Sequence, residues 1–274
     1  MLHDFYSIKH HYISQIKTSM FKLFNNLIFR FCIGILLTIQ AVSAQQAIGY
    51  IRYKSYLGSK FDLESLYFNN HASLSISGAK KPSDDTPEEE STTKVSINFG
   101  REEGERYLKN ISEKRLTMKI TLPGSRNQAA YIEDSLEVIP WKLGESQKMC
   151  GSLLCLNATG TFKGRNYEAW FAPDIPVSTG PWKLWGLPGA ILEAQDDTGE
   201  VKFLFEVIEM PPKSNQEITL PYTPDAKRMT YNQYKMQIKL LSDRIQQFLI
   251  NKIQEGGGNI VSASTNFFTI EKDF

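Results

Sequence analysis

Alternating apolar and polar residues mark most of this chain from residue 47 to residue 208. The runs are short, rich in aromatic and β-branched side chains, and separated by glycine, proline and asparagine. This rhythm predicts an antiparallel meander of strands. We expect strands at 47–54, 63–68, 72–77, 94–99, 105–108, 115–122, 129–133, 138–143, 149–162 (one strand or a pair), 165–171, 190–194 and 201–208, with a short strand or tail at 266–270.

The period changes after Thr230. Thr230 and Gln233 have the spacing of a helix N-cap and its capping partner. After Thr230, apolar residues recur at steps of three and four until three glycines at 256–258. This pattern predicts a helix over about 230–254. The apolar residues are Tyr231, Tyr234, Ile238, Leu241, Ile245 and Phe248. We expect this stripe to cover one side of the sheet; a partner-binding face is the alternative.

These elements together predict a mainly β fold. We expect a curved antiparallel sheet or half-barrel with one long C-terminal helix packed on it, with an α+β fold as the alternative. Residues 80–92 contain two prolines, several acidic side chains and almost no apolar residue, so they predict a solvated, mobile loop. Its carboxylates lack the regular spacing and turn glycine of a calcium loop.

The N-terminal segment predicts export. An apolar run over 31–39 follows Lys22 and Arg30 and ends in Val42-Ser43-Ala44, the pattern of a signal peptide cleaved after residue 44, with Met20 as an alternative start. An uncleaved anchor is the other interpretation, but the run is shorter than the roughly 20 residues of a bilayer span. We therefore expect a single domain over 45–274 in the periplasm, cell envelope or extracellular space, without a transmembrane span.

Charge and histidine content narrow the function. The whole chain has a formal net charge of +1 and no basic block, which argues against nucleic-acid binding. Three of its four histidines precede the predicted cleavage point, leaving His71 in a polar turn. A zinc site built from several histidines is thereby excluded, and a histidine-based catalytic triad would have to use His71. We expect no metal and no cofactor.

Two cysteines, Cys150 and Cys155, follow the predicted signal peptide. An even number in an exported protein suggests a disulfide. An extended strand would hold the two about 16 Å apart, however, whereas a disulfide requires Cα atoms within about 7 Å. Pairing therefore requires a turn or bulge at Gly151-Ser152, and both states stay open.

The densest motif is Gly180–Glu193, in which two tryptophans, Trp182 and Trp185, stand among glycines and prolines. Read with four earlier segments, this motif resembles the GLPGLI family of exported proteins from Bacteroidetes-type bacteria. The resemblance is carried by Ile139–Leu143, Cys155–Thr159, Phe162–Arg165, Ala169–Ser178 and the name motif Gly186, Leu187, Pro188, Gly189, Ala190 and Ile191. Ala190 departs from the family's leucine, which trims a side chain where a strand begins.

The resemblance implies a β-rich exported protein but no reaction. The family is largely uncharacterised and has no established catalytic residues; a link to outer-membrane uptake systems has been suggested for it, as has a role as a non-catalytic module beside glycan-processing enzymes. We therefore expect a non-catalytic binding or accessory protein of the envelope, with an outer-membrane protein, a peptide or a glycan as partner.

Five residues are candidates for binding, on different grounds. An arginine beside aromatic and acidic residues suits a carboxylate, and a tryptophan held by a rigid turn suits a sugar, peptide or protein contact. The candidates are Arg165, Trp170, Asp174, Trp182 and Trp185. Structural ion pairing and core packing are the alternatives for each.

Two other function classes stay open. A hydrolase of peptides or glycans would use carboxylates from Asp174, Glu168 and Glu193, because glycoside hydrolysis needs two of them about 5–10 Å apart in a cleft. The spacing selects no pair, and the chain lacks a Gly-x-Ser-x-Gly nucleophile elbow. A purely structural envelope component is the third class.

Overall fold

The computed structural model describes residues 46–78, 104–125, 128–254 and 270–271. The chain divides into two units, Met1–Gln46 and Ala47–Phe274, and all elements below belong to the second. The predicted signal peptide, the acidic loop 80–92, the expected strand 94–99 and the glycines at 256–258 lie outside the described residues, so these predictions stay open.

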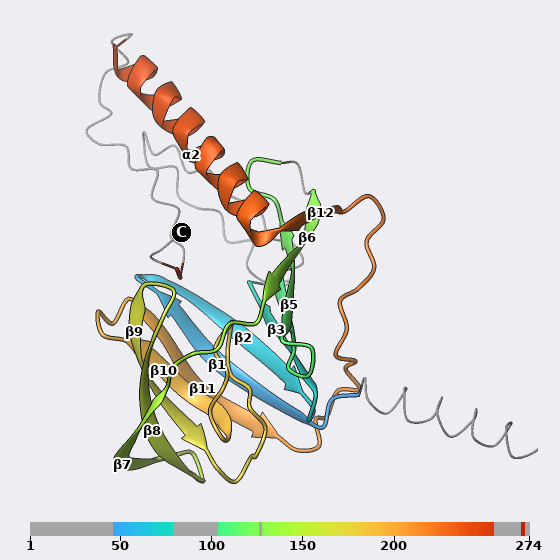
Figure 1. Cartoon of the computed structure of the whole chain (residues 1–274), viewed down its shortest axis with the longest axis vertical. Coiled ribbons are helices and arrows are strands. Elements are labelled where there is room, and N and C mark those ends of the chain that lie inside the picture. The colour runs from blue at the N-terminus through green and yellow to red at the C-terminus, as the bar shows by residue number, and fades with distance from the viewer. Residues whose placement is uncertain (1–45, 79–103, 126–127, 255–269, 272–274) are drawn as a thin grey trace, which may run out of the picture. The chain divides into compact units, whose positions relative to one another are not determined.

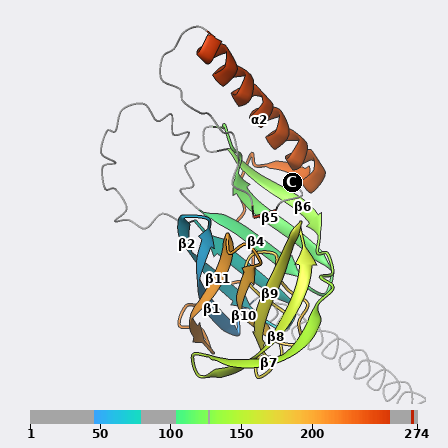
Figure 2. The ribbon, with the colours of Figure 1, turned by 90° about the vertical axis from the view of Figure 1, so that its left-hand side faces the viewer.

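One open sheet of twelve strands, not closed into a barrel, forms most of the secondary structure of the described residues (Figures 1 and 2). The strands are β1 (Gly49–Leu57), β2 (Lys60–Phe68), β3 (Ala72–Ser77), β4 (Glu105–Asn110), β5 (Arg115–Thr121), β6 (Ala129–Ser135), β7 (Lys142–Cys150), β8 (Leu153–Phe162), β9 (Arg165–Ala172), β10 (Ala190–Asp196), β11 (Val201–Glu209) and β12 (Lys227–Thr230). The helix α2 (Tyr231–Gln254) follows them.

The strand order is β12-β6-β5-β4-β3-β2-β1-β11-β10-β9-β8-β7. Neighbours are antiparallel throughout, apart from β12, which runs parallel to β6. The predicted mainly β fold, with an antiparallel sheet and a C-terminal helix, is confirmed.

The strand expected over 138–143 is wrong in its position. The structure leaves residues 136–141 outside any strand and begins β7 at Lys142. Ile139 is buried, and the Trp141 indole N–H donates to the Trp185 carbonyl oxygen at 2.7 Å. These core contacts outweigh the local alternation, because tertiary packing routinely overrides strand propensity.

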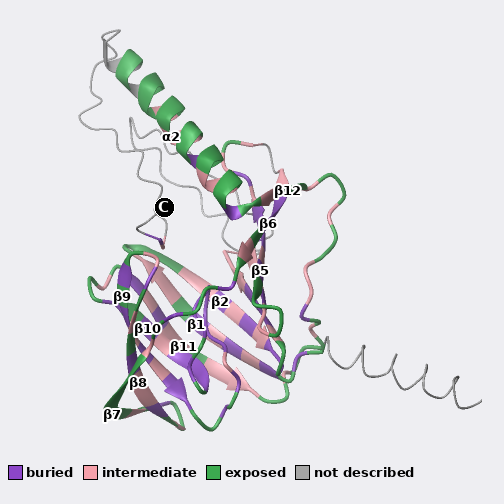
Figure 3. Ribbon diagram, in the orientation of Figure 1, coloured by how far each residue is buried: buried purple, intermediate pink, exposed green. Residues whose placement is uncertain are grey.

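The core lies between one face of the sheet and the long connection 173–189 that joins β9 to β10. We call this face the inner face; it includes Glu64 of β2, Lys109 of β4 and Phe162 of β8, each of which contacts the connection. The connection contributes large buried side chains of its own: Ile175, Val177, Trp182, Leu184, Trp185 and Leu187. Figure 3 shows buried residues along the central strands.

Lys109 holds the connection in place. Its ammonium group, fully buried, donates to the carbonyl oxygens of Gly180, Trp182 (2.9 Å) and Leu184 (3.2 Å). Three N–H donors thus meet three acceptors. The buried Glu64 carboxylate accepts the Trp182 N–H at 2.5 Å. Burial lowers the pKa of Lys109 and raises that of Glu64, and the attraction between the two groups offsets part of each shift.

The predicted capping box begins α2. Gln233 N–H donates to Thr230 Oγ1 at 3.3 Å, and Thr230 N–H donates to Gln233 Oε1 at 2.8 Å. The apolar stripe packs only in its first half, against β12 and β6: Tyr231 and Ile238 are buried, whereas Phe248 is 56 % exposed. Figure 3 accordingly shows much of α2 as exposed.

We expect Lys109→Met to destabilise the fold strongly. The change leaves three buried carbonyl oxygens without their donor and Glu64 without its cationic neighbour, and breaking a buried charged pair costs about 3–5 kcal/mol. Urea unfolding of the chain from residue 45 would measure the loss. Lys54→Met, at an exposed position of β1, is the control and should change the free energy of unfolding by less than about 0.5 kcal/mol; equal effects would contradict the role of Lys109.

Candidate functional site

The two tryptophans of the connection belong to the core. Trp182 is 4 % and Trp185 is 8 % exposed, and the Trp185 indole N–H donates to the Glu137 carbonyl oxygen at 2.7 Å. Trp182 packs edge-on against Phe162 and has a φ of 48°. This left-handed conformation is costly for a bulky residue, and the contacts of its N–H and carbonyl with Glu64 and Lys109 hold it. In this structure neither tryptophan offers an exposed ring.

At two positions of the name motif, steric constraints explain why the residue is glycine. A Cβ atom on Gly189 would lie 2.3 Å from the Ala172 carbonyl oxygen, where β9 and β10 begin to pair. Gly186 has a φ of 99°, which side-chain-bearing residues rarely adopt. Ala190, at the departure from the family motif, is fully buried. The motif therefore describes a packing requirement.

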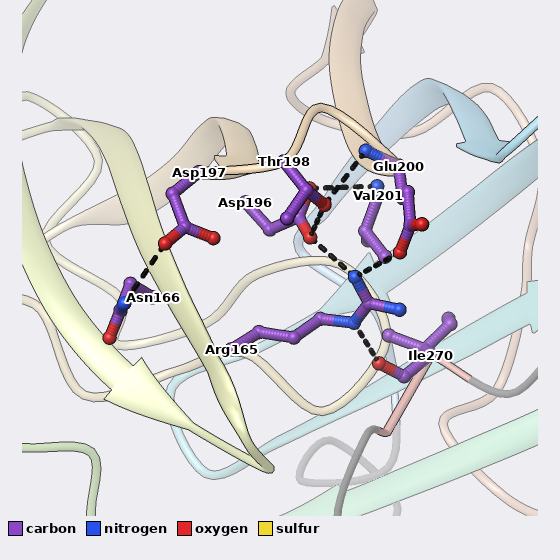
Figure 4. Close-up of polar contacts among 8 residues, drawn as sticks. All are labelled: Arg165, Asn166, Asp196, Asp197, Thr198, Glu200, Val201 and Ile270. Atoms are coloured by element: carbon purple, nitrogen blue, oxygen red, sulfur yellow. Dashed lines mark hydrogen bonds and ion pairs between the residues drawn. The ribbon is translucent and has the colours of Figure 1, made fainter.

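Arg165 is a buried anchor (Figure 4). Its guanidinium donates to Asp196, to Glu200 Oε2 at 2.9 Å and to the Ile270 carbonyl oxygen at 2.6 Å. Asp196 in turn accepts the Val201 N–H at 3.0 Å, which closes the turn between β10 and β11. Arg165 is thus engaged by this chain's own carboxylates, as the structural alternative expects.

The Asp196 carboxylate is held in its charged form. Burial by itself raises the pKa of Asp196, but hydrogen bonds from the Thr198 hydroxyl, the Val201 N–H and the Arg165 guanidinium outweigh burial and lower it below the usual value. The lowered pKa means that the charged Asp196 carboxylate, paired with Arg165, stabilises the hairpin turn.

An open polar depression of about 590 Å³ lies over β8, β9 and β10. Residues of β9 alternate in burial: Arg165 and Tyr167 are buried, whereas Asn166 is exposed and Glu168 half-buried. Asn166 and Glu168 line the depression together with Tyr167. We call the side of β8–β10 that carries Asn166 and Glu168 the polar face. The depression is also lined by Thr159, Thr161 and Gln195 of this face, by Asp197 just after β10, and by Lys142 at the start of β7.

The strand register arranges these groups in two rows across three strands. In the first row, Glu168 pairs with Thr159 on one side and with Gln195 on the other. In the second row, Thr161 donates to Asn166 Oδ1 at 2.8 Å, and Asn166 Nδ2 donates to Asp197 Oδ2 at 3.0 Å. Figure 4 shows the Asn166–Asp197 contact beside the Arg165 cluster. The rows present hydroxyl, amide and carboxylate groups in fixed positions.

The remaining candidates lie outside this depression. Trp170 is half-buried on β9 two residues beyond Glu168, and the Lys148 ammonium lies 4.4 Å from its ring centroid. Lys148 also pairs with Glu193 at 2.5 Å. Asp174 is exposed in the turn after β9. Of the three carboxylates named for hydrolysis, only Glu168 lines the depression.

Cys150 and Cys155 are brought together by the turn at Gly151-Ser152, which joins β7 to β8. Both thiols are free and buried, and the Cys155 Sγ donates to the Leu153 carbonyl oxygen at 3.8 Å. Burial, with their mutual contact, raises the pKa of Cys155 to about 12. The turn removes the geometric objection to a disulfide, and the pairing itself stays a prediction.

Sequence reasoning missed a second polar cluster, centred on Lys183. This lysine of the connection is 3 % exposed and pairs with Glu271 Oε1 at 2.6 Å; Asp134 Oδ2 lies 4.0 Å away. The Tyr231 hydroxyl donates to Glu271, and its ring lies 4.0 Å from the Lys183 ammonium. A depression of about 300 Å³, lined in part by Asp134 and Tyr231, adjoins this cluster. The sequence feature that could have indicated this cluster is the position of Lys183 between two tryptophans.

Two further findings concern only the described part of the chain. None of its helices has the length and hydropathy to cross a membrane. No group of three or more histidine, cysteine or acidic side chains there is placed to hold a metal ion.

In comparisons with known proteins, one family model of unknown function matches a short part of the chain. Residues 160–193 match the model described as "Protein of unknown function (Porph_ging)", which is consistent with the resemblance to GLPGLI proteins without confirming it. The match covers β9, the connection and the start of β10. No curated protein matches the chain.

Solved structures resemble this chain only distantly. A structure of PNGF-II in space group P21 has 14 % sequence identity and a TM-score of 0.47, over 70 % of this chain and 32 % of that one. An uncharacterised conserved protein from Thermus thermophilus has 12 % identity and a TM-score of 0.38, over 73 % of this chain and 98 % of that one. This chain therefore spans about a third of PNGF-II, and such likeness supports no function.

We expect Asp196→Asn to flatten the acid dependence of stability. Because the folded-state pKa of Asp196 is lowered, its contribution is present above the unfolded pKa of about 4 and is lost as pH falls through the folded-state value. The variant should lose about 1–3 kcal/mol at pH 7, and its stability should converge with that of the original chain as the pH falls from 7 through the folded-state pKa of Asp196. Urea unfolding over this range of pH tests the prediction. As a control, Asp174→Asn, in an exposed turn, should show the same pH dependence of the free energy of unfolding as the original chain. A difference in this free energy between Asp196→Asn and the original chain that stays constant with pH would contradict the stabilising role of the Asp196 carboxylate.

We expect Cys150 and Cys155 to form a disulfide when the chain from residue 45 is refolded under oxidising conditions. The closed loop is short, so the bond should stabilise the protein by about 2 kcal/mol. Non-reduced peptide mapping would show a peptide lighter by two hydrogens. Labelling of both cysteines by a thiol reagent, after unfolding without reduction, would contradict the pairing.

Proposed function

We propose that this protein is an exported binding protein of the cell envelope and that the polar face of β8–β10 recognises a glycan. The observation that carries the proposal is the row Thr159–Glu168–Gln195, which lines an open depression on strands whose other side is buried. The signal-like N-terminus supports export. The resemblance to GLPGLI proteins supports an accessory role, including service to an outer-membrane uptake system.

The chemistry of the row suits a polyol. Sugar hydroxyls donate and accept hydrogen bonds, and the row offers a hydroxyl, a carboxylate and an amide, which supply both functions. Neighbouring strands hold these groups about 4.8 Å apart, so a ligand meets them with little loss of conformational entropy. Trp170 extends the same face with an aromatic ring.

A hydrolase acting on the same ligand is the second candidate. Glu168 and Asp197 both line the depression, and glycoside hydrolysis uses a pair of carboxylates. Asp197 accepts a hydrogen bond from Asn166, as an oriented carboxylate would. Release of shorter products from a bound glycan would favour this candidate, and intact recovery of the ligand would favour binding alone.

We expect Glu168→Gln to weaken glycan binding about tenfold or more. A hydrogen bond to a charged acceptor contributes about 1.5–3 kcal/mol, and each step of about 1.4 kcal/mol is a factor of ten in affinity. Glycan arrays with the chain from residue 45 would identify a ligand, and calorimetry would give its affinity. Glu145→Gln, an exposed carboxylate of β7 that does not line the depression, is the matched control. Equal binding by both variants would contradict the proposed face.

A further inference from the structure

Side chains from elements distant in sequence donate hydrogen bonds to Ile270 and Glu271, near the C-terminus. Arg165 of β9 donates to the Ile270 carbonyl oxygen at 2.6 Å, Lys183 of the connection donates to Glu271 Oε1 at 2.6 Å, and the Tyr231 hydroxyl of α2 donates to Glu271. Ile270 and Glu271 belong to no strand or helix. One carbonyl and one carboxylate are therefore recognised as they would be in a bound peptide.

Lys183 depends on this carboxylate. Its side chain is 3 % exposed. Among the described residues, the Glu271 carboxylate lies 2.6 Å from its ammonium and the other ion-pair partner, Asp134, lies at 4.0 Å. Lys163 and Arg165 are engaged differently: Lys163 pairs with Glu137, and Arg165 with Asp196 and Glu200. Removing the Glu271 carboxylate would therefore leave a buried ammonium poorly compensated, which is costly.

Tyr231 makes the site selective for a carboxylate. Its hydroxyl donates to one oxygen of Glu271 while Lys183 donates to the other. An amide at this position would place an N–H₂ group against one of these two donors. The Tyr231 ring also lies 4.0 Å from the Lys183 ammonium, a cation–π contact that fixes the donor's position.

The geometry points to a receptor site for an acidic peptide, formed by Arg165, Lys183 and Tyr231, in which the chain's own Ile270–Glu271 is a resident and displaceable ligand. The same segment from a second copy of this chain carries the same carbonyl and carboxylate and fits the same donors. Exchange between copies would join two molecules through this site, separately from the polar face of β8–β10.

The test uses the full chain with Glu271→Ala, which weakens the resident segment. A labelled hexapeptide with the sequence of residues 269–274, containing Glu271, is added and binding is followed by fluorescence anisotropy. We expect this variant to bind the peptide at least tenfold more tightly than the original chain, in which the resident segment competes. A peptide with Glu271→Gln should bind at least tenfold more weakly, and adding Lys183→Met to the variant should abolish binding.

Glu200→Ala is the matched control chain. It removes a carboxylate from the same region but keeps Glu271 on Lys183, so it should bind the peptide no better than the original chain. Equal binding of the Glu and Gln peptides, or no binding to a folded Glu271→Ala chain, would overturn the proposal. If that chain fails to fold, refolding with each peptide decides: recovery with the Glu peptide alone supports the site, and recovery with neither contradicts it.

Discussion

The rest of this structure depends on the hydrogen bonds between the buried Lys109 ammonium and the connection 173–189. An open sheet leaves one face without a partner unless another layer covers it, and here a connection between two of the sheet's own strands supplies that layer. The connection has little regular structure, so its carbonyl oxygens need donors once they are buried. Lys109 satisfies three of them, which allows the tryptophans and leucines around them to pack as a core.

Local patterns predicted much of the fold. Alternation located most strands, and the Thr230–Gln233 spacing located the start of α2, because these features depend on neighbours in sequence. The 138–143 segment and β12 depend on distant partners: Trp141 turns toward Trp185, and β12 pairs in parallel with β6. Sequence alone does not determine such pairings, so these two elements were misplaced or missed.

The candidate site was predicted less well, and β9 shows why. Alternation along this strand places Asn166 and Glu168 on the face opposite Arg165 and Tyr167, but it does not say which face is covered. Arg165, a binding candidate because its guanidinium can bind a carboxylate, lies on the covered side with Asp196. Asn166 and Glu168 lie on the accessible side. The Lys183 cluster was beyond prediction because it joins the connection, α2 and Glu271, which no short motif links.

The two ends of the sheet differ in how they limit further pairing. Beyond β6 the edge strand β12 has only four residues, and α2 begins directly after it. At the other end β7 is longer, but its register with β8 shifts between Leu143 and Gln147, and Lys142 and Lys148 flank the irregularity. Short edges, bulges and lysines are features that discourage edge-to-edge association. These features disfavour growth of this open sheet by the addition of strands from neighbouring molecules.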